Sequence, residues 1–268
     1  MADLKQIVTQ SEILPVVLFT GGPRIEHDVV QFAVRLEQDP DIELLAIFSE
    51  SPVRGISGVL GDLWRRRGIL AIPLFVLTLL RPLGSAIRNP FATVRRWHVF
   101  RSIRPRICFV PDLHDPGVVT RIRDLQPALG LVYGGPIIKP TVFDLPRFGT
   151  LGIHHGKVPE YRGKKTTFWA MYNGEEQVGV TIQRISSRLD GGDVLRAGCV
   201  RVGKRLPMSV KRRLHELGLD LYMEGIHAMR NQTAEFFTQS GRASTLYRDP
   251  GARDILRFWF QYLVGVLK

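Results

Sequence analysis

Apolar runs alternate with amphipathic stretches along most of the chain. Five runs without a period of two predict buried strands, at residues 13–22, 42–50, 106–115, 128–136 and 149–156. Apolar residues at helical spacing predict helices over 25–38 and 118–127, between these strands. Further on, residues 178–187 and 193–202 predict two paired strands, and 209–231 predicts a long amphipathic helix. Strands that alternate with helices in this way predict an α/β fold, with a mostly parallel sheet covered by helices on both faces.

Two apolar segments do not fit this alternation. They are residues 69–80, which follow three arginines and contain Pro73, and the C-terminal residues 254–267. Both are shorter than the ~20 apolar residues that a bilayer-spanning helix needs. Each is interpreted as a core helix, an interfacial membrane helix flanked by basic residues, or a helix that docks a partner. We expect residues 53–104 to be largely helical, with 69–80 packed on the C-terminal helix or lying on a membrane surface.

Basic residues are concentrated in one part of the chain, whose net charge is +12. Residues 53–106 hold eleven arginines and a single acid, Asp62. This segment is a solvated basic face, a contact for an anionic membrane, or a contact for nucleic acid or a phosphorylated substrate. Cys108 and Cys199 are the only cysteines, too few for a disulfide framework or a zinc cluster, so we expect no metal. With no secretory signal pattern at the N-terminus, we expect a cytoplasmic location.

Candidate chemistry lies where the fifth predicted strand ends. The stretch GTLGIHHGKVPEYRG, residues 149–163, places His154 and His155 before a glycine-containing loop. Histidine titrates near neutral pH, which suits an acid or a base, although a packing histidine is the other interpretation. Asp190 and Asp193 follow in the glycine-rich turn SSRLDGGDVL, residues 186–195, as partners for an imidazole or as solvated turn acids.

These two stretches resemble the 10-formyltetrahydrofolate-dependent formyltransferases, which act on methionyl-tRNA, glycinamide ribonucleotide and amino sugars. The residues that carry the resemblance are Gly149, His154, Pro159, Tyr161, Arg162, Gly163, Gly179, Thr181, Asp190 and Asp193. It is strong over about residues 105–200 and weaker over 14–50. It implies a Rossmann-like catalytic domain over residues 10–230, interrupted by the insertion at 53–104. Residues 231–268 then form a C-terminal tail with a terminal helix.

The resemblance also implies roles for individual residues. His154 is the catalytic histidine and Asp190 the aspartate that keeps it charged, so we expect the two within hydrogen-bond reach, directly or through one water. Gly152 stands where the family has a catalytic asparagine, whose amide stabilises the oxyanion. Three explanations are open: His155 or a main-chain N–H replaces the amide, a water or substrate group does so, or formyl transfer has been lost. We expect His155 to point toward the same cavity as His154 or to contribute its main chain there.

Binding residues follow from the same resemblance. It places the folate beside Tyr133, Gly135, Ile137, Ile138 and Asp193, and the acceptor beside Tyr161 and Arg162. The implied function is N-formyl transfer from 10-formyltetrahydrofolate to the amine of a small, phosphorylated or sugar-type acceptor. The alternative is a non-catalytic folate-binding relative or a 10-formyltetrahydrofolate hydrolase. We disfavour tRNA as acceptor, because the residues after 232 are too few and too helical for the barrel domain of methionyl-tRNA formyltransferases.

Overall fold

A computed structural model describes residues 13–22, 25–51, 100–203, 206–239 and 244–265 of the chain. Residues 69–80, and most of the expected insertion at 53–104, lie outside these ranges. Its helical character and its packing on the C-terminal helix therefore stay predictions. Within the insertion only its last residues are described: residues 100–103 are helical, and a 3₁₀ turn follows at Arg104–Arg106.

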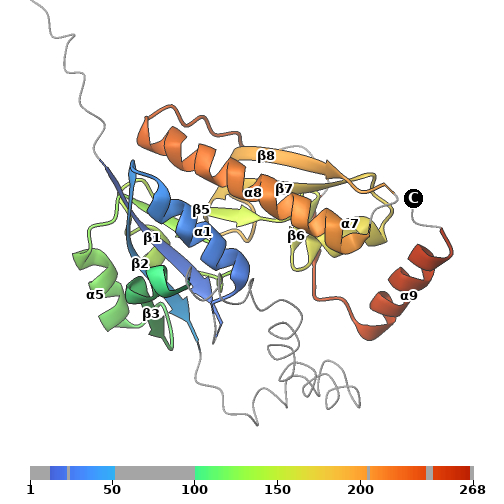
Figure 1. The fold of residues 1–268 in the computed structure, drawn as a ribbon, viewed down its shortest axis with the longest axis horizontal. Helices are drawn as coiled ribbons and strands as arrows, with labels where there is room; N and C mark the ends of the chain where they lie inside the picture. Colours follow the sequence, from blue (N-terminus) through green and yellow to red (C-terminus); the bar gives the residue numbers. More distant parts are fainter. Residues whose placement is uncertain (1–12, 23–24, 52–99, 204–205, 240–243, 266–268) are drawn as a thin grey trace, which may run out of the picture.

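A seven-stranded sheet forms the centre of the fold, in the order β3-β2-β1-β4-β5-β7-β8 (Figure 1). The strands are β1 (Leu14–Gly21), β2 (Ile42–Glu50), β3 (Ile107–Val110), β4 (Leu129–Val132), β5 (Thr150–His154), β7 (Gln177–Arg184) and β8 (Val194–Arg201). The first five in this order run parallel, whereas β7 and β8 pair antiparallel. The predicted α/β class is confirmed, and so are the seven predicted strands.

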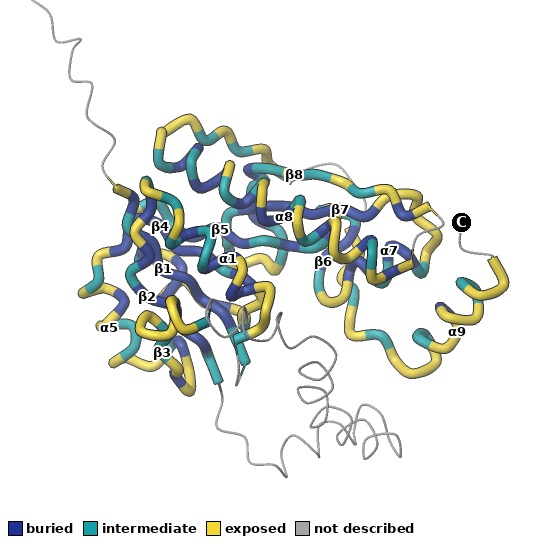
Figure 2. Tube along the Cα trace, in the orientation of Figure 1, coloured by how far each residue is buried: buried dark blue, intermediate teal, exposed yellow. Residues whose placement is uncertain are grey.

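Helices cover both faces of the sheet, as predicted. The helices are α1 (His27–Gln38), α5 (Pro116–Asp124), α6 (Pro140–Phe143), α7 (Thr166–Tyr172), α8 (Pro207–Arg230) and α9 (Ala252–Leu263). Apolar side chains of α1 and α8 form one core with the sheet, and those of α5 and α6 form a second core on its other face. The inner strands β1, β4, β5 and β7 are accordingly mostly buried, whereas the edge strands β3 and β8 and the outer sides of the helices are partly exposed (Figure 2).

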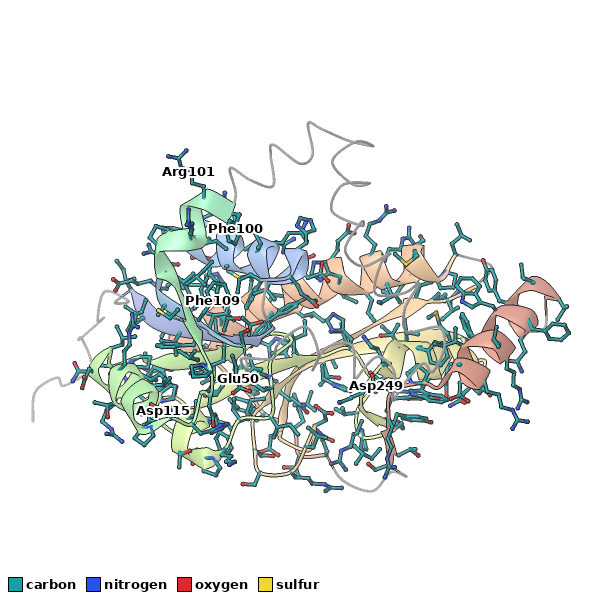
Figure 3. All side chains as sticks on the ribbon, turned by 90° about the horizontal axis from the view of Figure 1, so that it is seen from below. Glu50, Phe100, Arg101, Phe109, Asp115 and Asp249 are labelled. Atoms are coloured by element: carbon teal, nitrogen blue, oxygen red, sulfur yellow. The ribbon has the colours of Figure 1, made fainter. Side chains whose placement is uncertain are left out.

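Two acidic side chains accept main-chain hydrogen bonds in the region where β2 and β3 end (Figure 3). The Asp115 side chain accepts a hydrogen bond of 2.9 Å from the Gly117 N–H, so it caps the first turn of α5. Pro116 then takes the first helical position, where its missing N–H costs nothing. Glu50, at the end of β2, accepts the Leu113 N–H at 3.0 Å and ties the loop before α5 to the sheet.

The described part of the predicted tail packs back onto the fold. Phe237 forms a β-bridge with Val194 of β8. The strand β9 (Thr245–Tyr247) pairs in parallel with β6 (Tyr161–Gly163), and Phe258 of α9 is buried in a core shared with α7. The tail therefore contributes to the loop that follows β5, while the domain boundary at residue 230 stays a prediction. Among the described helices, none is both long and apolar enough to cross a membrane.

Candidate active site

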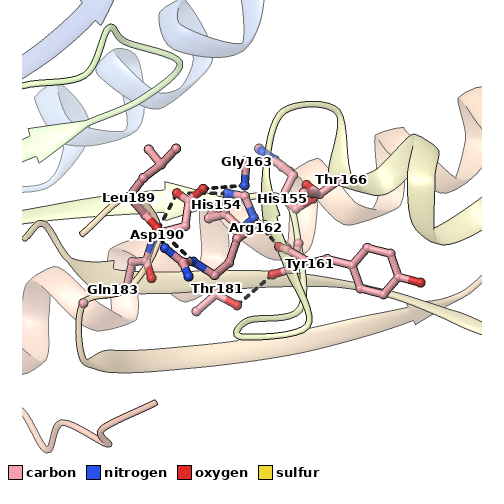
Figure 4. A network of polar contacts seen from close by, with 12 residues as sticks. His154, His155, Tyr161, Arg162, Gly163, Thr166, Thr181, Gln183, Leu189 and Asp190 are labelled. Atoms are coloured by element: carbon pink, nitrogen blue, oxygen red, sulfur yellow. Dashed lines mark hydrogen bonds and ion pairs between the residues drawn. The ribbon is translucent and has the colours of Figure 1, made fainter. Parts of the chain in front are cut away.

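His154 is the last residue of β5, and its ring is held inside the fold. The side chain is buried, and Nε2 lies 2.8 Å from the main-chain oxygen of Tyr161 in the loop that follows (Figure 4). Because a carbonyl oxygen only accepts, Nε2 carries a proton and donates it. The main chain of the loop therefore helps to set the orientation of the ring.

Gly156 makes this close approach possible. A Cβ at residue 156 would lie 2.4 Å from Nε2 of His154 and 2.5 Å from the Tyr161 oxygen, inside the hydrogen bond between them. The Gly156 carbonyl is fixed in turn by the Thr181 hydroxyl, which donates to it at 2.9 Å. Only glycine fits where the loop passes under the imidazole.

Asp190 faces the other nitrogen of the ring. Its Oδ1 lies 3.3 Å from Nδ1 of His154, and its Oδ2 accepts the Gly163 N–H at 2.8 Å. The residue has φ = 48°, a left-handed conformation that is uncommon outside glycine. Strain of this kind is typical of functional sites, where surrounding contacts hold it. The expected reach between His154 and Asp190 is confirmed.

Both ring nitrogens of His154 face hydrogen-bond acceptors. Nε2 faces a carbonyl and Nδ1 faces a carboxylate, and both of these groups accept hydrogen bonds. A ring with a proton on each nitrogen donates to both groups. The site thus places an imidazole, with its N–H donors, beside a carboxylate at the end of the strand.

Gly152 lies two residues before His154 and therefore on the same face of β5. A Cβ built on Gly152 would come 2.5 Å from Cδ1 of Ile185, in the loop that leaves β7. The apolar Ile185 side chain thus occupies the space that a larger residue at 152 would enter. Residue 152 has no side-chain amide that could donate to an oxyanion.

His155 belongs to a second polar cluster, between α1, β4 and α8. Its ring meets the Tyr133 ring edge-on, with 6.2 Å between centroids. Tyr133 Oη lies 2.6 Å from Nδ1 of His215, and Nε2 of His215 lies 2.9 Å from Oε1 of Gln31. Burial raises the pKa of Tyr133, so its hydroxyl keeps the proton and donates it to His215. Burial, followed by the nearby His215 and His154, lowers the pKa of His155 to about 4.

This low pKa predicts that acid destabilises the protein through His155. The unfolded ring takes up a proton below about pH 6.5, whereas the folded ring resists protonation until about pH 4. The contribution of neutral His155 to the free energy of unfolding is thus fully present above pH 6.5 and is lost as the pH falls to 4. This loss amounts to at most about 3 kcal/mol. We expect His155→Gln to reduce this loss in urea unfolding curves recorded between pH 7.5 and 4.5. If the free energy of unfolding of wild type and His155→Gln depended on pH in the same way, the prediction would be wrong. His227→Gln is the control.

A cleft of about 1910 Å³ connects these groups. Among the predicted site residues, the cleft is lined by His154, His155, Asp190, Tyr133, Gly135, Ile137 and Ile138. His155 therefore faces the same cavity as His154, as expected. Tyr161 instead lines a smaller pocket of about 300 Å³, which His155 lines as well. Arg162 and Asp193 line neither cavity.

Comparison with known proteins identifies the domain. The sequence profile of the family described as "Formyl transferase" matches residues 103–226, which include β5, the loop after it, and Asp190. This chain contains a formyl transferase domain. A methionyl-tRNA formyltransferase of Geobacter metallireducens is 32% identical over 155 residues, 56% of this chain and 48% of the relative. Across four curated methionyl-tRNA formyltransferases, the chain spans 36% to 48% of the relative's length.

Solved structures share the fold of this formyl transferase domain. Phosphoribosylglycinamide formyltransferase from Anaplasma phagocytophilum superposes with a TM-score of 0.58 at 13% identity, covering 89% of this chain and 100% of that protein. An N-formyltransferase from Helicobacter canadensis, in complex with folinic acid and dTDP-3-aminofucose, gives 0.52 at 15% identity, covering 88% and 70%. At these identities the likeness establishes the fold.

Arg162 of the formyl transferase domain is bound to protein groups. Its guanidinium donates to the Leu189 oxygen through Nε at 2.9 Å and also through one terminal nitrogen, while the other donates to Ser244 Oγ at 3.1 Å. It therefore holds the turn that presents Asp190 (Figure 4). Tyr161 donates its hydroxyl to Glu175 at 2.8 Å and stacks on Tyr247. Acceptor binding by Arg162 and Tyr161 stays a prediction.

Two glutamines near Asp190 were not predicted from the sequence, and neither was the cluster around His215. Gln183 on β7 and Gln239 after α8 both contact Asp190. His215 lies on α8, where its position in an amphipathic helix predicts only a partly buried residue. The one signal for Gln183 is a polar residue inside an apolar strand, whose buried side chain needs a partner.

Proposed function

We propose that this chain transfers a formyl group from 10-formyltetrahydrofolate to the amine of a small, phosphorylated or sugar-type acceptor. The observation that carries the proposal is the His154–Asp190 pair, with 3.3 Å between Nδ1 and Oδ1, in the main cleft of a formyl transferase domain. Curated relatives are named as formyltransferases, and the Helicobacter canadensis enzyme was solved with folinic acid, a formylated folate. Both support the same donor here.

The walls of the cleft suit the folate. One wall is the turn after β4, where Gly134 and Gly135 expose main-chain groups and the Ile137 side chain is 72% exposed. The facing wall is the turn after β7, with Ile185 and Leu189. A flat heteroaromatic ring fits between apolar side chains while its edge bonds to main-chain groups. Tyr133, Gly135, Ile137 and Ile138 would hold the pterin, and the donor would supply the formyl carbon near His154.

The residues at the end of β5 then assist the transfer. The amine nitrogen of the acceptor bonds to the formyl carbon, the bond from that carbon to N10 breaks, and the amine proton ends on N10. Negative charge develops on the formyl oxygen, and an N–H of the His154 ring stabilises it. The 3.3 Å contact of Nδ1 to Asp190 is longer than the 2.8 Å contact of Nε2 to Tyr161, so Nδ1–H is the less tightly held donor and the one that we assign to the formyl oxygen.

Polar and basic side chains in the cleft support a small, hydroxylated and anionic acceptor. Asp28, Gln31 and His215 line one end of the cleft and offer groups that bond hydroxyls and an amine. Basic residues also line it: Arg35, Lys164, Lys165, Arg184, Arg188, Lys211 and Arg212. Such side chains bind phosphate through charge-assisted hydrogen bonds.

The experiment supplies donor labelled with ¹³C in the formyl group, together with a panel of amines. The panel contains amino sugars, nucleotide-linked amino sugars, phosphorylated amines and methionyl-tRNA. A labelled formamide on a small amine supports the proposal, and label on methionyl-tRNA alone overturns its acceptor class. Labelled formate without formamide indicates a hydrolase. Binding of 5-formyltetrahydrofolate without turnover indicates a folate-binding relative, in agreement with the apolar Ile185 beside Gly152.

We also propose that α9 contacts an anionic membrane surface. Leu256, Phe260 and Leu263 are 72%, 66% and 79% exposed and lie on one side of the helix, opposite the buried Phe258. Arg253 and Arg257 are exposed next to this apolar face, and the chain carries a net charge of +12. An apolar face bordered by arginines suits an anionic leaflet, where each basic residue contributes ~1 kcal/mol.

Vesicle co-sedimentation tests this contact. We expect the protein to sediment with vesicles containing phosphatidylglycerol, less so as salt is raised, and not with pure phosphatidylcholine. Replacing both Leu256 and Phe260 by serine should remove most of the binding. Equal sedimentation of this double variant would contradict the proposal. The proposal would also be contradicted if the wild type did not bind anionic vesicles and instead formed a dimer through this face, as measured by sedimentation velocity.

A further inference from the structure

Two carboxamides lie next to Asp190, those of Gln183 and Gln239. Gln183, on β7, is 3% exposed and sits opposite Gly152 in the pairing of β5 with β7. Its Nε2 lies 3.4 Å from Oδ1 of Asp190. Gln239 comes from the segment after α8, and its Nε2 lies 3.0 Å from Oε1 of Gln183.

We propose that Gln183 and Gln239 are positioning residues that hold the Asp190 carboxylate against His154. We name this pair the carboxamide clamp. The role rests on the proposed function, because it assigns the clamp to the formyl-transfer site. It goes beyond that function by giving the C-terminal segment a part in catalysis.

The first support is the direction of the hydrogen bonds. Gln239 donates from Nε2 to Oε1 of Gln183, which leaves Nε2 of Gln183 to face the carboxylate of Asp190. Asp190 thereby receives N–H groups from Gln183, His154 and Gly163. Donors on separate elements fix the carboxylate in one orientation, and only one of them is the catalytic histidine.

The second support is the turn itself. Nε2 of Gln239 also lies 3.2 Å from the Asp190 carbonyl oxygen and 2.7 Å from that of Gly192. Asp190 has a left-handed backbone, and Gly192 packs so tightly that a Cβ there would overlap the Arg184 oxygen. Such a backbone persists only when its surroundings hold it. The two hydrogens of this Nε2 are shared among three oxygens, those of Gly192, Gln183 and Asp190, so Gln239 holds the backbone of the turn while Gln183 holds the side chain.

Leucine at either position keeps the size of the side chain and removes the hydrogen bonds. Gln183→Leu takes one donor from Oδ1 of Asp190, and Gln239→Leu frees the turn and the Gln183 amide. Supporting residues behind a catalytic group typically change activity by ~10- to 100-fold when replaced. We expect kcat to fall by this factor in each variant, while KM for the donor and Kd for 5-formyltetrahydrofolate change less than about threefold.

The experiment compares both variants with Gln177→Leu, an exposed glutamine at the other end of β7. The readouts are kcat, KM and the downfield proton resonance of the His154 Nδ1–H. We expect the clamp variants to lose or shift this resonance, and the control to keep it. If Gln239→Leu is insoluble, Gln239→Asn replaces it, since it keeps the amide but shortens its reach.

The outcomes separate the clamp from the function it serves. A kcat within twofold of wild type in both clamp variants, with an unchanged His154 resonance, overturns the clamp and leaves the proposed function standing. A wild type that transfers no formyl group to any amine overturns the proposed function. In that case the His154 Nδ1–H resonance alone tests the clamp. If this resonance shifts in the clamp variants but not in Gln177→Leu, Gln183 and Gln239 still position Asp190.

Discussion

We expect His154→Ala to lower the rate of formyl transfer by roughly 10³-fold, and Asp190→Asn to lower it by a similar factor. The first removes the imidazole at the end of β5, and the second removes the carboxylate that lies 3.3 Å from it. A donor at a developing oxyanion is typically worth ~10²- to 10³-fold in rate, and general acid–base assistance ~10²- to 10⁴-fold. The measurement is kcat for release of tetrahydrofolate with saturating donor and acceptor.

A matched histidine–aspartate pair provides the control for these two variants. Nε2 of His227 lies 2.9 Å from Oδ2 of Asp39, at the end of α8 and outside the cleft. His227→Ala should therefore keep the wild-type kcat. Retention of more than a tenth of the wild-type rate in His154→Ala, with folate binding intact, would show that the imidazole is not the essential donor.

Gly156→Ala should be nearly as damaging to turnover. The added methyl group would lie 2.4 Å from Nε2 of His154 and 2.5 Å from the Tyr161 oxygen, both far inside van der Waals contact. To admit it, the ring must turn away from Tyr161, and its distance to Asp190 must change. We expect a loss of roughly 10²-fold in kcat, because misplacing a catalytic group by about 1 Å costs this much. Overpacking should also destabilise the fold by about 1–3 kcal/mol.

The stability of Gly156→Ala is measured by urea unfolding beside its kcat. Gly251→Ala, at the start of α9, is the control, because its added methyl group makes only an ordinary 3.4 Å contact with Asp254. The two effects of Gly156→Ala are separated by assaying at a temperature where the variant is fully folded. A folded variant with wild-type kcat would show that the bond from His154 to Tyr161 does not orient the ring.

The sheet and its helices were accessible from the sequence because each depends on a local pattern. Continuous apolar runs marked the buried parallel strands, and helical spacing marked α1, α5 and α8. The pairing of β6 with β9 was not predicted. Each has only three residues, they lie about 80 residues apart in the chain, and β9 is largely exposed. A strand so short and exposed has no hydrophobic pattern to detect.

The residues of the candidate site also differ in whether a local sequence pattern predicts them. His154 and Asp190 were found because they lie in motifs that end a strand or enter a turn, and the sheet brings such ends together. Gln239 was not found, because it reaches Asp190 across 49 residues from a polar segment that any glutamine would suit. Gly152 was noticed from its motif, but only the structure shows that Ile185 fills the space beside it.

The most direct test is a single-turnover reaction of the purified chain with ¹³C-formyl donor and an amine that accepts the label, beside His154→Ala. Formyl transfer predicts amine-dependent release of tetrahydrofolate in wild type, matched by one formamide per donor consumed. In His154→Ala both signals should fall together by roughly 10³-fold while the donor still binds. Donor binding without amine-dependent release in wild type, or equal rates in the two proteins, would contradict a formyl-transfer site built on His154 and Asp190.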